Sequence, residues 1–110
     1  MAKLDSLQYG FRAALQVAEA IRNNNDTVLT IDLDHNKIGP EGAIVLAGAI
    51  QDNNTIQTID LDHNKIGNEG AIALAGAIRN SNTIHTINLA GNKIGTVSYT
   101  HLTLPTICSV

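Results

Sequence analysis

The chain has no tryptophan, one phenylalanine and two tyrosines among its 110 residues, so aromatic side chains cannot build its core. The apolar residues are instead isoleucine, leucine, valine and alanine, which suit a core of many small, similar layers. A single cysteine, Cys108, excludes an internal disulfide and favours a reducing compartment. The longest apolar run, Ala43–Ile50, is far shorter than the roughly 20 residues that a membrane helix needs.

Clusters of lysine and arginine are also missing, and the net charge is only -3, which argues against a nucleic-acid partner. The first residues contain no apolar stretch typical of a signal peptide. Together these absences predict a cytoplasmic protein with no membrane partner. A secreted effector remains the alternative location.

An internal repeat organises the chain. Shifted by 28 residues, Thr30–Gly39 matches Thr58–Gly67 without a mismatch, and a third copy begins at Thr86. When 29–56 is aligned with 57–84, only six positions differ. A period of this length indicates a solenoid, in which each repeat buries its apolar face only against its neighbours.

Each copy has two halves with different periodicity. The first half alternates apolar and polar side chains, as in Val28, Ile31 and Leu33, which predicts a short strand with one buried face. The second half spaces its apolar residues as one face of a helix does. In the first copy these residues are Ala43, Leu46, Ala47 and Ile50. The repeating unit is therefore a strand, a turn, a helix and a loop.

The strand half of the repeat resembles a known family signature. Its pattern is Val28-x-x-Ile31-x-Leu33-x-x-Asn36-x-Ile38, with copies from Ile56 and Ile84, and it resembles the leucine-rich repeat. The helix half, Gly39-x-x-Gly42-Ala43-x-x-Leu46-Ala47, together with the period of 28, is similar to the ribonuclease-inhibitor-like subclass. The resemblance covers about residues 10–95.

This resemblance implies an α/β leucine-rich-repeat solenoid. Such a solenoid is a curved right-handed superhelix with parallel strands on the concave side and helices on the convex side. The resemblance also implies that Asn36, Asn64 and Asn92 form an inward ladder, because a buried amide must find hydrogen-bond partners. We expect 1–27 to be a partial repeat or cap helix, and 28–55, 56–83 and the truncated 84–95 to be repeats.

The tail at 96–110 departs from the pattern. It lacks the Glu-Gly-Ala helix expected after Gly95, and it contains no glycine, alanine or residue with a permanent charge. Its segment Val97–Thr106 resembles the translation of a transposon-end adapter used in sequencing libraries. We therefore interpret the tail as a non-native translation artefact and the chain as a fragment of a longer array. The alternative is a divergent cap, because terminal repeats are often atypical.

The sequence indicates no catalytic residues, cofactor or metal. It contains no nucleophile paired with a base and no phosphate-binding loop. Asp32-x-Asp34-x-Asn36 is similar to the start of a calcium loop, but Lys37 stands where that loop needs glycine.

His35 and His63 are one period apart and should lie roughly 5 Å from each other on adjacent strands. With the neighbouring aspartates they could hold a divalent metal. The third repeat has Ala90 and Gly91 at the positions of this aspartate and histidine, so it adds no third histidine to the pair. We therefore interpret both as surface histidines without a ligand.

The predicted concave face carries columns of polar side chains, one residue per repeat. The candidate partner-binding residues are Thr30, Asp32, Asp34, Gln57, Thr58, Asp60, Asp62, His85, Thr86 and Asn88. One interpretation is an acidic strip that binds a basic partner surface. The other is a solvated strand face of a near-consensus array, which the near-invariance of the columns favours.

The family resemblance implies a protein-interaction scaffold that binds another protein on its concave face and catalyses no reaction. Two alternatives remain open: a regulator similar to activators of Ran-type small GTPases, and the sensor part of a larger receptor or bacterial effector. No residue here matches a GTPase-binding site, and fold alone does not determine function.

Overall fold

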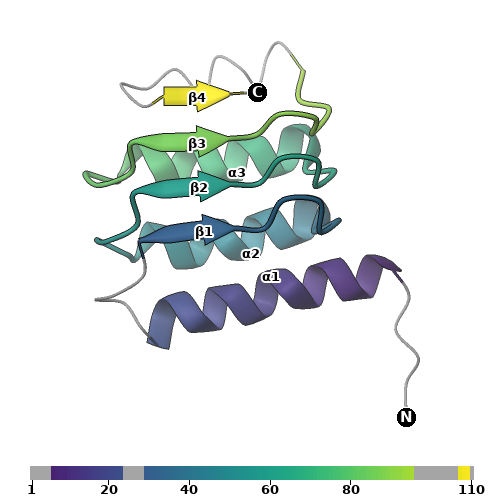
Figure 1. Cartoon of the computed structure of the whole chain (residues 1–110), viewed down its shortest axis with the longest axis horizontal. Helices are drawn as coiled ribbons and strands as arrows, with labels where there is room; N and C mark the ends of the chain where they lie inside the picture. The colour runs from purple at the N-terminus through teal and green to yellow at the C-terminus, as the bar shows by residue number, and fades with distance from the viewer. Residues whose placement is uncertain (1–5, 24–28, 96–106, 110) are drawn as a thin grey trace.

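The computed structural model describes residues 6–23, 29–95 and 107–109, which alternate between helices and strands. Strands lie in one layer and helices in the other, and each new unit is added beside the previous one (Figure 1). The elements are α1 (Ser6–Asn23), β1 (Thr30–Asp32), α2 (Gly39–Gln51), β2 (Thr58–Asp60), α3 (Gly67–Arg79), β3 (Thr86–Asn88) and β4 (Ile107–Ser109). The strand–helix alternation predicted from the repeat is confirmed.

The strands form one parallel sheet in chain order, β1-β2-β3-β4. Thr30 pairs with Thr58, and Thr58 pairs with Thr86, so equivalent residues of successive repeats stand side by side. The backbone ladder continues beyond the short strands. Leu33 N–H donates to the Asp60 carbonyl at 2.9 Å, and Leu61 N–H donates to the Asn88 carbonyl at 2.9 Å. Residues that pair in the sheet are therefore one 28-residue period apart in the sequence.

The core lies between the sheet and the helices and is built in layers. Each repeat contributes an isoleucine and a leucine from its strand region, and the two full repeats add the apolar face of a helix. In repeat 2 these are Ile59, Leu61, Ile66, Leu74 and Ile78, all at most 2% exposed. Val28, which the alternation also places in the core, lies outside the described residues.

Small residues set how closely the helices pack. A Cβ atom added at Gly70 of α3 would lie 2.9 Å from Ala43 Cβ of α2 and would also collide with the Ile66 side chain. The same position in α2, Gly42, faces Ala14 Cβ of α1 at 3.1 Å. A glycine of α2 and a glycine of α3 therefore each face an alanine of the preceding helix. In this contact α1 packs against α2 as α2 packs against α3.

The tail contributes one strand to the sheet. Ile107–Ser109 forms β4 and pairs in parallel with β3, with Thr86 opposite Ile107. The edge of β3 offers unpaired backbone groups, which almost any extended segment can satisfy. This pairing therefore needs no match to the repeat, and it does not bear on the origin of the tail.

None of the described helices is both long enough and apolar enough to cross a bilayer.

Candidate partner-binding face

The candidate residues gather on the exposed face of the sheet because alternate strand residues point away from the core. In β1 the central residue, Ile31, is buried, while Thr30 and Asp32 are exposed. The register then aligns Asp32 with Asp60 and Asp60 with Asn88. The columns predicted from the sequence thus exist as neighbouring side chains, and we call this surface the acidic face.

A flanking column precedes the strands. His85 N–H donates to the Gln57 carbonyl at 2.9 Å, and Gln57 N–H donates to the Leu29 carbonyl at 2.8 Å. Their side chains are all exposed, and Leu29 retains 52% of its accessible surface. The residue in this column differs in each repeat, as leucine, glutamine and histidine.

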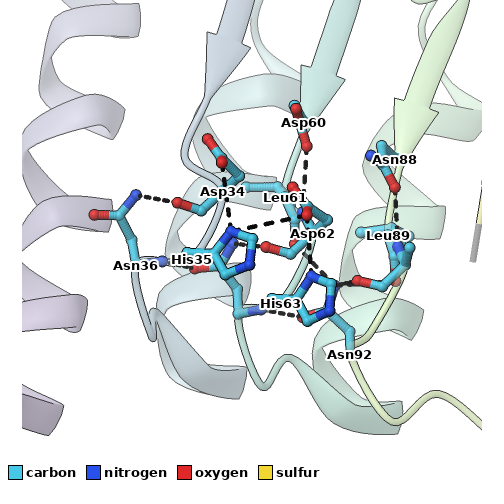
Figure 2. Close-up of polar contacts among 12 residues, drawn as sticks. Asp34, His35, Asn36, Asp60, Leu61, Asp62, His63, Asn88, Leu89 and Asn92 are labelled. Carbon is cyan, nitrogen blue, oxygen red and sulfur yellow. Dashed lines mark hydrogen bonds and ion pairs between the residues drawn. The ribbon is translucent and has the colours of Figure 1, made fainter.

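Carboxylates converge at the carboxyl ends of β1 and β2. Oxygen atoms of Asp32, Asp34 and Asp60 all lie within 4.8 Å of one another. Within the described residues, the ion pairs of this cluster are those of Asp34 and Asp62 with histidine (Figure 2). The acidic face therefore presents negative charge that forms no ion pair with a lysine or arginine among residues 6–23 and 29–95.

On the first strand, hydrogen bonding between two neighbouring carboxyl groups raises the pKa of one and lowers the pKa of the other. The pKa of Asp32 is raised, mainly because its side chain shares a hydrogen bond with Asp34 and faces the Asp34 charge. The pKa of Asp34 is lowered by that same bond and by a hydrogen bond with His35.

The second strand repeats the arrangement with greater burial. Desolvation raises the pKa of Asp60, and the hydrogen bond with Asp62 raises it further. The pKa of Asp62 is lowered, first by the hydrogen bond with His63 and then by the one with Asp60. Asp34 and Asp62 are therefore the more strongly ionised members of the two pairs.

The two histidines stack on each other and contact Asp34 and Asp62. Their ring centroids are 4.5 Å apart and the planes differ by 9°, which confirms the spacing expected from the period (Figure 2). Both residues have a left-handed backbone, with φ of 58° at His35 and 56° at His63. In the third repeat Gly91 takes this conformation, with φ of 70°.

Asn64 and Asn92 hold the turns together beneath the acidic face. Asn64 Oδ1 accepts from the backbone N–H of Asn36 at 2.9 Å, and its Nδ2 donates to the Leu33 carbonyl at 2.8 Å. Asn92 makes the equivalent bonds to Asn64 N–H and to the Leu61 carbonyl, each at 2.8 Å. Both asparagines are fully buried, as the family resemblance implies.

Asn36 does not share this environment. It is exposed, and its Nδ2 donates to the Asp34 carbonyl within its own turn at 3.0 Å. The later asparagines reach back to the turn of the preceding repeat, whereas the described element before repeat 1 is a helix, α1. The prediction that all three asparagines form an inward ladder is therefore wrong for Asn36.

The sequence analysis missed a second set of side-chain hydrogen bonds, in the loops after α2 and α3. Asn53 Oδ1 accepts from the backbone N–H groups of Thr55 and Ile56, each at 2.7 Å. Ser81 Oγ does the same one period later, accepting from Thr83 and Ile84. Asparagine and serine are both common in such turns. Their presence in these loops was the sequence signal that could have predicted the hydrogen bonds.

The repeats also match a known protein family. The leucine-rich-repeat family model matches residues 24–47, 52–75 and 80–98, which together are more than half of the chain. The protein belongs to the leucine-rich-repeat family. The three matches start one 28-residue period apart, in agreement with the repeat found in the sequence. No curated protein matches the chain.

Proposed function

We propose that this protein is a non-enzymatic interaction scaffold that binds a lysine- or arginine-rich surface of another protein through its acidic face. Leucine-rich repeats generally mediate protein–protein interactions, and this supports the general class. The observation that carries the finer proposal is the convergence of Asp32, Asp34 and Asp60 on one exposed sheet face.

The charges of the acidic face support a basic partner. Repulsion between like charges on adjacent strands destabilises the free protein slightly, and a cationic partner would relieve it. The lysines of this region, Lys37, Lys65 and Lys93, are exposed at the turns beyond the carboxylates. They leave the centre of the acidic face open to a partner cation.

The test is binding of a fluorescent arginine-rich peptide, followed by anisotropy at several salt concentrations. The key variant is the double substitution Asp32→Asn and Asp60→Asn. Asparagine already occupies this column at Asn88, where its Oδ1 accepts from Ala90 N–H just as Asp60 Oδ1 accepts from Asp62 N–H. The substitution therefore removes charge without removing the local hydrogen bond.

The matched control is Glu41→Gln with Glu69→Gln, which removes the same charge from exposed positions in α2 and α3. We expect the acidic-face variant to weaken binding by about 5- to 30-fold, since it removes two charges and each screened contact contributes about 0.5–1 kcal/mol. The control should change it by less than about twofold. Equal weakening by both variants would mean that only net charge matters and would refute a defined acidic face.

A further inference from the structure

The stacked histidines and the carboxylate between them have the chemistry of a metal site. His35 and His63 follow β1 and β2, and their side chains remain 62% and 55% exposed. Asp62, which is 19% exposed, lies beside both rings (Figure 2). Two imidazoles and one carboxylate are ligands typical of zinc and of similar borderline divalent ions.

The donor atoms stand at distances close to those of a coordinated ion. Asp62 Oδ2 is 3.0 Å from His63 Nδ1 and 3.9 Å from His35 Nδ1. With zinc–ligand bonds of about 2.0–2.1 Å, donor atoms in a tetrahedral site are about 3.4 Å apart. The two observed distances bracket this value, and all three donor atoms lie within 4.8 Å of one another.

A further carboxylate is near enough to complete the set. Asp34 Oδ2 lies 3.4 Å from His35 Nδ1. Two parallel rings cannot both direct their in-plane lone pairs at one ion, so binding must turn at least one ring out of the stack. The exposure of both side chains leaves room for this rotation.

The turns that carry the histidines have a left-handed backbone at more than one position, since Lys37 and Lys65 also have positive φ, of 54° and 57°. A left-handed conformation costs a non-glycine residue of the order of 1 kcal/mol, and glycine adopts it without this cost. The third repeat uses glycine here, and a Cβ atom at Gly91 would lie 2.6 Å from the His63 ring. The absence of a side chain at Gly91 therefore leaves space for the His63 ring.

We propose that His35, His63 and Asp62 bind one Zn²⁺ ion, with Asp34 as a fourth ligand. The ion would join repeat 1 to repeat 2 across the sheet. The proposal shares Asp62 with the acidic face but does not rest on binding of a basic partner. Zinc is titrated here without any peptide, so the two proposals can fail separately.

The experiment is calorimetric titration of the full chain with ZnCl₂, together with ¹H–¹⁵N spectra before and after addition. The main variants are His35→Asn and His63→Asn, because asparagine tolerates the left-handed backbone. His85→Asn is the matched control, since His85 is an exposed histidine of the flanking column. His101→Asn tests the remaining histidine of the chain.

We expect one zinc ion per chain and large shifts at residues 34–36 and 62–64. Loss of a supporting outer-shell group commonly costs 10- to 100-fold in metal affinity, so loss of a ligand should weaken binding at least about tenfold. Asp62→Asn should do the same, while the variants at His85 and His101 should stay within about twofold of the parent. No zinc uptake would overturn the proposal, as would unchanged affinity in His63→Asn or an equal loss in His85→Asn.

Discussion

At the scale of single residues, position in the array decides what each side chain does. Asn64 and Asn92 are buried because each has a preceding turn to bind, whereas the equivalent Asn36 is exposed. The family signature could predict the buried pair. It could not predict the exception, because the pattern of one repeat does not show which element lies against it.

The left-handed histidines were equally hard to predict. A backbone angle depends on the turn as a whole, and the sequence gives only one hint, the glycine that replaces histidine at Gly91. Their 28-residue separation, in contrast, was enough to predict their proximity, because it follows from the period alone.

Replacing Asn64 with alanine should lower the free energy of unfolding by about 3 kcal/mol. The change leaves the Asn36 N–H and the Leu33 carbonyl without their bonds to Asn64, and each unsatisfied buried group costs about 1–3 kcal/mol. Urea unfolding measures the difference. Asn36→Ala is the control and should cost less than about 1 kcal/mol, since that side chain is exposed. Equal losses in the two variants would contradict a ladder role specific to Asn64.

At the scale of elements, periodicity predicted most of the structure. The shift of 28 residues located β1, β2 and β3, and α1 lies within the partial repeat or cap helix expected at 1–27. The pairing of β4 with β3 could not be predicted in this way. It depends on backbone groups at a sheet edge and not on a side-chain pattern.

The sequence also could not show which helix glycines are needed for packing. Gly70 and Gly76 lie in the same helix, and only the structure separates their surroundings. A Cβ atom at Gly70 meets Ala43 of the neighbouring helix, whereas one at Gly76 has nothing within 4 Å.

Alanine at these two positions should therefore have opposite effects. Gly70→Ala forces α2 and α3 apart and should cost about 1–3 kcal/mol of stability. Gly76→Ala should gain up to about 1 kcal/mol, because alanine loses less conformational entropy in a helix than glycine. Thermal unfolding followed by circular dichroism compares the two variants. A stabilised Gly70→Ala protein would show that the glycine–alanine contact does not set the helix spacing.

At the scale of the whole molecule, the stacking of repeats creates both the core and the surface. Each layer of isoleucine and leucine is closed only when the next repeat covers it. The same register places Asp32 beside Asp60 and one histidine over the other. The columns of the acidic face could therefore be predicted from the repeat, but the sharing of hydrogen bonds among carboxylates required coordinates.

The register itself is the central claim, and NMR couplings across hydrogen bonds test it most directly. The account predicts a coupling from the Leu33 amide nitrogen to the Asp60 carbonyl carbon, and one from Leu61 to Asn88, because each N–H donates across the sheet at 2.9 Å. Couplings from these amides to other carbonyls, or none because the amides exchange freely with water, would contradict repeats stacked in register.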